Sequence, residues 1–564
     1  MSALRMDLGA FAAKVRERLD ALKAEGFHRR LAACDTTLWG DDTLRQRVAS
    51  TRLGWITAPP AMLERAGEFA AFAHDAAHDG FQRVLLLGMG GSSLAPEVLA
   101  RVFGNRVKGL PLLMLDDTSP ASVRAAAAAC DPRTTLVLVA SKSGGTVEVT
   151  SFEKAFYARA QAALGDKAGR GFVAITDPGT SLEMLAANRH YRRVFSNPAD
   201  IGGRYSALSC FGLVPAALLG IDTAALCQHA LAELRELAAD GGAALELGAA
   251  LGTLAHAGHD KLALVMGPEF APLGVWIEQL VAESTGKEGR GILPVDGEPL
   301  LAPEAYGKDR VFVSVSLGAL PAATEAALDA LAAAGHPVIR WSRSEHEAVG
   351  AEFVRWEIAT AVAGAVLGVN PFDEPNVSEA KAATKRVLQQ VAALGHFPKH
   401  DPRAIEGALA VHATQSYGVS GTDARSWAAS FIAGLKPGDY GAILAYLHRT
   451  DARHAALERI RAAIVRATGN ATTLGYGPRY LHSTGQLHKG GPATGAFLQI
   501  TSEEGDEPIP DESFSFQVLR DAQAAGDYEV LVAHELRTMR VHVSGEAESG
   551  LVKLAEAFEA AATR

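Results

Sequence analysis

The sequence predicts an α/β protein with two doubly wound parallel sheets, a helical N-terminal arm and a C-terminal α+β extension. Short apolar runs recur between residues 84 and 195 and again between residues 262 and 341, and helix-like segments separate them. This alternation is typical of parallel sheets, because a crossover helix must connect each strand to the next. We therefore expect an arm at residues 1–78, α/β domains at 79–222 and 223–395, and the extension at 396–564.

Composition and charge describe a globular chain. Of its 564 residues, 48% are hydrophobic and 21% are charged, and its apolar runs are too short to span a bilayer. The first twenty residues alternate charge with Leu, Phe and Ala, which favours an amphipathic helix over a secretory leader. The net charge of −10 argues against nonspecific nucleic-acid binding. We expect a cytoplasmic protein that binds neither membranes nor nucleic acid.

The elements follow in order along the chain. Leu8 to about His78 reads as helical, with interruptions at Asp35–Thr36 and Pro59–Pro60. Beyond Asn370 the pattern is helical to about Ala467, and the tail after it is mixed. Between these regions, the predicted strands are Val84–Leu87, Pro111–Leu115, Thr135–Ala140, Phe172–Thr176, Arg193–Phe195, Leu262–Met266, Val311–Val315 and Pro337–Trp341.

The stretch Val84–Leu99, VLLLGMGGSSLAPEVL, has the pattern of a strand, a tight turn and a helix. Gly88, Gly90 and Gly91 free the backbone N–H groups at the start of the helix, where they can bind an oxyanion. Ser92 and Ser93 can cap the helix or contact the same ligand. Taken alone, such a turn is more often structural than functional.

A second loop of this type follows the strand Thr135–Ala140. It reads SKSGGT and places the hydroxyls of Ser141, Ser143 and Thr146, together with Lys142, at the start of a predicted helix. Hydroxyls and backbone amides together suit a phosphate monoester. In a doubly wound sheet the loops at the carboxyl ends of neighbouring strands meet, so both loops can face one ligand. The alternative is that both are serine-rich capping turns.

Four further motifs contain residues able to move protons. They are IGGRYSAL with Arg204, QLVAESTGK with Gln279 and Glu283, NPFDEPNVSEAK with Glu374 and Lys381, and YLHSTGQLHKGG with His482 and His488. A carboxyl group half-buried at a helix end has a raised pKa, which suits a general base. Taken alone, each residue has an ordinary alternative, such as a surface ion pair or a solvated helix end.

Together these motifs resemble phosphoglucose isomerase, a family built from sugar-isomerase (SIS) domains, and most of all the isomerase half of transaldolase/phosphoglucose isomerase fusion proteins. The residues ahead of the first predicted strand are too few for a transaldolase barrel, so an isomerase alone is expected. Two departures stand out. Glu374 takes the place of the usual glutamine, and the histidine motif follows Lys381 instead of preceding it.

The resemblance implies a role for each motif. Glu283 is the base that moves a proton between C2 and C1, Arg204 stabilises the enediolate-like intermediate, and His482 opens the sugar ring together with Lys381. His488 is the second candidate for that histidine. The residues implied to bind the substrate and its phosphate are Gly91, Ser92, Ser141, Lys142, Ser143, Thr146, Gln279 and Glu374.

The implied activity is the interconversion of glucose 6-phosphate and fructose 6-phosphate through a cis-enediol, without a metal or a cofactor. The family also implies a homodimer with shared active sites. One rival is an isomerase that accepts mannose 6-phosphate as well. A second is a noncatalytic sugar-phosphate sensor, which would need the phosphate loops but not the proton-transfer residues.

Overall fold

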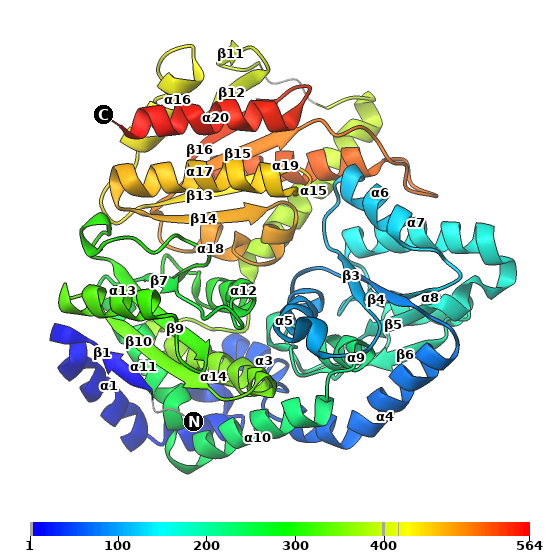
Figure 1. The fold of residues 1–564 in the computed structure, drawn as a ribbon, viewed down its shortest axis with the longest axis horizontal. Helices are drawn as coiled ribbons and strands as arrows, with labels where there is room; N and C mark the ends of the chain where they lie inside the picture. The colour runs from blue at the N-terminus through cyan, green and yellow to red at the C-terminus, as the bar shows by residue number, and fades with distance from the viewer. Residues whose placement is uncertain (1–3, 398–400, 415–416, 564) are drawn as a thin grey trace.

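Three sheets, each covered by helices, make up the protein in the computed structural model, which describes residues 4–397, 401–414 and 417–563. In Figure 1 the first sheet lies at the right, the second at the lower left and the third at the top. In the described part of the chain, no helix is long and apolar enough to cross a membrane. The domain boundaries expected from the sequence stay predictions.

The first sheet contains five parallel strands in the order β3-β2-β4-β5-β6, and all five were predicted from the sequence. Its order reverses direction between β2 and β4, so the loops after these two strands lie side by side. The strands are β2 (Arg83–Leu87), β3 (Leu112–Leu115), β4 (Thr135–Ala140), β5 (Phe172–Thr176) and β6 (Arg193–Ser196). The helices are α5 (Leu94–Phe103), α6 (Pro120–Ala129), α7 (Val147–Leu164), α8 (Ser181–Asn188) and α9 (Cys210–Leu219).

The second sheet has the order β1-β10-β9-β7-β8. The sequence predicted three of its strands but not the short β1 and β8. β1 (Arg5–Asp7) corrects the expected N-terminal helix: it pairs antiparallel with β10, and Asp7 accepts a hydrogen bond from Arg340. The other strands are β7 (Lys261–Leu264), β8 (Leu293–Val295), β9 (Arg310–Leu317) and β10 (Val338–Arg343). The helices of this region are α10 (Thr223–Asp240), α11 (Gly242–His256), α12 (Leu273–Thr285), α13 (Ala322–Ala333) and α14 (Val349–Leu367).

The N-terminal arm is mainly helical, as predicted. The interruption expected near Pro59 and Pro60 is present: α3 ends at Ser50, and the two prolines occupy the first turn of the next helix, where proline is tolerated. Figure 1 shows α1 beside the second sheet and α4 along the first. The helices are α1 (Ala12–Ala24), α2 (Phe27–Ala32), α3 (Thr43–Ser50) and α4 (Ala58–His78).

The third sheet corrects the helical pattern expected up to Ala467. Helices α15 (Pro375–Leu394), α16 (Ala424–Ala433) and α17 (Asp451–Thr468) are present, but three strands lie among them: β11 (Ala404–Glu406), β12 (Leu409–Ala413) and β13 (Tyr440–Tyr446). β13 contains two alanines and a leucine, which favour a helix, and its pairing with β14 and β15 overrides that preference. The remaining elements are β14 (Ala471–Tyr476), α18 (Gly485–Gly490), β15 (Gly495–Ser502), α19 (Phe516–Ala533), β16 (Arg537–Val543) and α20 (Ala547–Ala562).

The three sheets share one strand order. The parallel strands run β3-β2-β4-β5 in the first sheet, β8-β7-β9-β10 in the second and β14-β13-β15-β16 in the third. In each sheet, therefore, the first parallel strand along the chain has the second on one side. On its other side lies the third strand, and the fourth pairs with the third. The part of the chain after α15 thus contains a third doubly wound unit.

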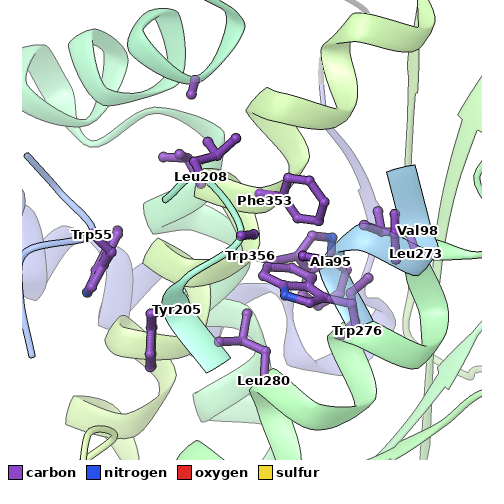
Figure 2. Packing of buried hydrophobic residues seen from close by; sticks show 14 of the residues in the cluster. Trp55, Ala95, Val98, Tyr205, Leu208, Leu273, Trp276, Leu280, Phe353 and Trp356 are labelled. Atoms are coloured by element: carbon purple, nitrogen blue, oxygen red, sulfur yellow. The ribbon is translucent and has the colours of Figure 1, made fainter. Parts of the chain in front are cut away.

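A buried aromatic cluster fixes helix α12 between the first two sheets (Figure 2). The rings of Trp276 and Phe353 lie 4.8 Å apart, edge to face, and Ala95 and Val98 of α5 pack beside them. Replacing such a buried aromatic with alanine costs about 3–5 kcal/mol. Helix α12 also carries Gln279 and Glu283, so this packing fixes the positions of both side chains.

Candidate active site

Two glycines let three loops meet above the first sheet. A Cβ at Gly91 would lie 1.9 Å from the carbonyl oxygen of Gly203, so the first glycine loop packs directly against the loop that carries Arg204. Gly90 has a φ of +54°, and a Cβ there would lie 2.9 Å from the carbonyl oxygen of His482. Larger side chains at these two positions would push the Arg204 and His482 loops away.

The second loop forms the N-terminus of α7, as predicted. The hydroxyls of Ser141 and Thr146 lie 3.1 Å apart, and the backbone N–H of Gly145 donates to Ser143 Oγ. Ser143 and Thr146 line a cavity of about 290 Å³, whereas Ser92 and Ser141 are buried and are not among its lining residues. Lys142 points elsewhere: its ammonium pairs with Asp177 and donates to the carbonyl of Ala199.

Arg204 is buried at the centre of a charged cluster. Its Nη1 lies 3.4 Å from Glu283 Oε1 and 3.1 Å from Glu374 Oε2. Its Nε donates to Ser284 Oγ at 2.8 Å, and its Nη2 donates to the carbonyl of Pro371 at 2.7 Å. The guanidinium is therefore held rigidly, with one edge facing two carboxylates.

The two carboxylates on Arg204 respond to it differently. Burial raises the pKa of Glu283 above its usual value, and the nearby charge of Glu374 raises it further, although Arg204 opposes both effects. Burial also disfavours the charged form of Glu374, but the charge and hydrogen bond of Arg204 prevail and lower its pKa. Glu283 thus has the raised pKa that suits a general base.

Gln279 connects the charged cluster to the histidine loop. Its amide nitrogen donates to Glu283 Oε2 at 3.2 Å and to the carbonyl of His482 at 2.7 Å. The amide oxygen of Gln279 is buried and has no hydrogen-bond partner in the described part of the chain. Gln279 and Glu283 are four residues apart on α12, so one turn of the helix sets their spacing.

His482 reaches the first sheet's helix α7. Its Nε2 lies 2.9 Å from Glu148 Oε1, and the amide of Gln523 donates to the same oxygen at 2.7 Å. Burial opposes the charged form of Glu148, but His482 and then Lys381 lower its pKa. Lys381 lines the same cavity as His482, Ser143 and Thr146.

His488, the second candidate, lies in a different environment. Its ring is buried, stacks on Tyr440 and shares a hydrogen bond with the tyrosine hydroxyl, 3.0 Å away. Burial lowers its pKa to about 3. The geometry therefore favours His482 for proton transfer in the cavity.

Neither Glu148 nor Gln523 could be recognised from the sequence. Glu148 lies in the first turn of α7, where an acidic residue is common because it complements the helix dipole, so it gave no functional signal. Gln523 lies inside α19 and belongs to no motif. Both gain significance only from the packing of distant segments.

Known proteins resemble this chain in sequence. The family model for phosphoglucose isomerase matches residues 65–231. A glucose-6-phosphate isomerase of Thermus thermophilus is 30% identical over 431 residues, covering 66% of this chain and 99% of that relative. A glucose-6-phosphate isomerase of Rubrobacter xylanophilus is 31% identical over 357 residues, covering 54% of this chain and 82% of that relative.

Solved structures resemble it in fold. The crystal structure of a hypothetical protein from Thermus thermophilus has a TM-score of 0.59 at 27% identity, covering 68% of this chain and 99% of that one. A glucose-6-phosphate isomerase from Chlamydia trachomatis has a TM-score of 0.52 at 18% identity, covering 68% and 86% respectively. Because a relative at 30% identity is matched over nearly its whole length, the chain belongs to the phosphoglucose isomerase family.

Proposed function

We propose that this protein interconverts glucose 6-phosphate and fructose 6-phosphate through a cis-enediol intermediate. The observation that carries the proposal is the position of Glu283: its carboxylate contacts Arg204 on one side and Gln279 on the other, and Gln279 also binds the His482 loop. Family membership supports the same reaction. An ion pair and two hydrogen bonds thus link a base, a cation and the loop of a proton-shuttling histidine.

The phosphate group binds at the second loop. The hydroxyls of Ser143 and Thr146 and the free N–H groups at the start of α7 face the cavity, and a helix N-terminus stabilises an anion. The hydroxyl of Ser141 contacts that of Thr146, and the first loop, with Gly91 and Ser92, packs against the loop that carries Arg204. Lys142 pairs with Asp177 and is left out of the proposed phosphate site. Binding the phosphate orients the reacting carbons and raises the rate of the later steps.

Proton transfer then takes place in two stages. His482 and Lys381 open the ring by moving a proton between the ring oxygen and the anomeric hydroxyl, while Glu148 orients the imidazole. Glu283 next removes the proton from C2 and returns it to C1. Arg204 stabilises the negative charge that develops on the enediolate oxygens, and Gln279 and Glu374 hold the substrate at their side.

Formation of glucose 6-phosphate from fructose 6-phosphate, measured on purified protein without added metal, tests this proposal. We expect steady turnover by the wild type and a loss of several orders of magnitude in Glu283→Gln, because removal of a proton-transfer group has effects of this size. Glu288→Gln, an exposed carboxylate on the same segment, is the matched control and should retain wild-type turnover.

The rival functions predict different results in the same assay. Release of fructose 6-phosphate from mannose 6-phosphate would extend the activity to a second epimer. Wild-type protein that binds fructose 6-phosphate without turnover would be a sensor and would refute the proposal. A homodimer and a cytoplasmic location stay predictions.

A further inference from the structure

The C-terminal unit, defined as the elements from β11 to α20 (404–562), contributes two residues to the site of the first sheet. His482 and Gln523 both bind Glu148 Oε1, and they come from chain positions more than three hundred residues beyond it. The carbonyl of His482 also binds Gln279 of α12. One chain therefore contains every group used in the proposed mechanism.

A side chain of the C-terminal unit occupies the crevice in which its sheet would ordinarily bind a ligand. In its strand order the crevice lies at the carboxyl ends of β13 and β15, where a doubly wound sheet ordinarily binds ligands. Glu504 occupies it: Oε1 accepts from the backbone N–H of His448 at 2.7 Å, and Oε2 accepts from Arg520 Nη1 at 2.7 Å. Ser119 of the first sheet's domain also donates to this carboxylate. Arg453 also pairs with Glu504, so both carboxylate oxygens are engaged within the protein and this crevice serves as an interface.

Buried contacts fix the C-terminal unit against the rest of the chain. Arg479, three residues before His482, pairs with Glu97 of α5 and lies 3.2 Å from Asp116. Helix α19 packs closely on α15: a Cβ at Gly526 would lie 2.7 Å from the backbone nitrogen of Thr384. Thr384 is one turn from Lys381 and Gly526 is one turn from Gln523, so this contact holds α15 and α19 together beside the cavity.

We propose that the C-terminal unit completes the active site in cis, so that a single chain is the catalytic unit whatever its oligomeric state. With Glu504 in its crevice, the unit supports His482 over the site of the first two sheets. This inference rests on the proposed function for its catalytic meaning, but its structural half can be tested without turnover.

Complementation between two inactive variants tests the catalytic half. Glu283→Gln and His482→Asn are coexpressed with different tags, and assemblies that contain both chains are purified on the two tags in succession. Completion in cis predicts no more activity than in the single variants, because every site lacks one group. If the sites were shared between two chains, one of the two sites in each mixed dimer would be intact, and about half of the wild-type turnover would return. That result would overturn the proposal.

A zero-length cross-link tests the structural half. Lys154 of α7 and Glu512 of the C-terminal unit form an ion pair of 2.5 Å across the interface, so a carbodiimide can join them by an amide bond. If the contact forms within one chain, the cross-linked protein should run at the mass of a single chain on a denaturing gel. The Glu512→Gln variant should not form the cross-link. A linked species of twice that mass would contradict the proposal. Since this readout needs no activity, an inactive wild type would refute the isomerase function without affecting the assembly result.

Discussion

Glu283 and Glu374 share one nitrogen of Arg204: Nη1 lies 3.4 Å from the first carboxylate and 3.1 Å from the second. The base of the proposed reaction therefore competes with a second carboxylate for the one cation that pairs with it among the described residues. The motif that Asn370–Lys381 resembles commonly has glutamine where this chain has Glu374, so we expect this competition to be absent from relatives that carry the glutamine.

Glu374→Gln should shift the acid limb of the kcat/KM pH profile to lower pH. The negative charge of Glu374 raises the pKa of Glu283, and without it Arg204 would pair with Glu283 alone. Since the base must be ionised to act, a lower pKa keeps it active in more acidic solution. Glu379→Gln, on the same helix and paired with His534, is the control and should leave the profile unchanged. An unchanged profile in Glu374→Gln would argue against coupling through Arg204.

Glu148→Gln should impair ring opening more than isomerisation. Its carboxylate holds the ring of His482, and losing this charged partner should lower turnover of glucose 6-phosphate by about 10²-fold. An aldose phosphate that cannot close a ring, such as a four-carbon sugar 4-phosphate, bypasses the step. We expect its turnover to change little. Equal losses on both substrates would indicate a general structural defect and not a role in ring opening.

Gly91→Ala should destabilise the protein and reduce activity. The added Cβ would lie 1.9 Å from the carbonyl oxygen of Gly203, so the backbone around Arg204 would have to move. Overpacking of this kind costs about 3 kcal/mol in the free energy of unfolding, which denaturant titration can measure. Gly67→Ala is the matched control, because it has open space on helix α4 and should be neutral or stabilising. Wild-type stability and turnover in Gly91→Ala would contradict the close loop packing.

His488 should make the protein sensitive to acid. Burial lowers its pKa from 6.5 to about 3, so below pH 6.5 the unfolded chain binds a proton that the native chain does not. This group therefore leaves the free energy of unfolding unchanged above pH 6.5. As the pH falls from 6.5 towards 3, it lowers the free energy of unfolding by about 1.4 kcal/mol per pH unit.

His488→Gln removes this contribution. Between pH 7 and pH 5 its free energy of unfolding should fall by about 2 kcal/mol less than that of the wild type. His74→Gln, an exposed histidine, provides the control. An identical acid response in wild type and His488→Gln would show that another group dominates.

Much of the fold could be predicted from local pattern. The five strands of the first sheet end in glycine or polar loops and are separated by complete helices, so their apolar runs are unambiguous. β13 could not be recognised, because Ala442, Leu444 and Ala445 favour a helix and only pairing with β14 and β15 makes the segment a strand. β1 was too short, and its pairing partner lies more than three hundred residues away.

The candidate site divides in the same way. Arg204, Gln279 and Glu283 lie in compact motifs, and two of them share one helix, so sequence alone could indicate them. Glu148 and Gln523 could not be found, because their contact joins positions 375 residues apart and depends on how the C-terminal unit packs. The contact of His482 could not be predicted for the same reason. The fold brings its motif to Glu148 across 334 residues of sequence.

Deuterium incorporation during isomerisation of glucose 6-phosphate in D₂O is the sharpest test of Glu283 as the base. We predict that wild-type protein introduces solvent deuterium at C1 of fructose 6-phosphate, because the carboxylate of Glu283 exchanges its proton with solvent while the cis-enediol exists. Glu283→Gln should neither isomerise nor exchange. Wild-type rates of isomerisation and exchange in Glu283→Gln would show that another group is the base, and that result would contradict proton transfer by Glu283.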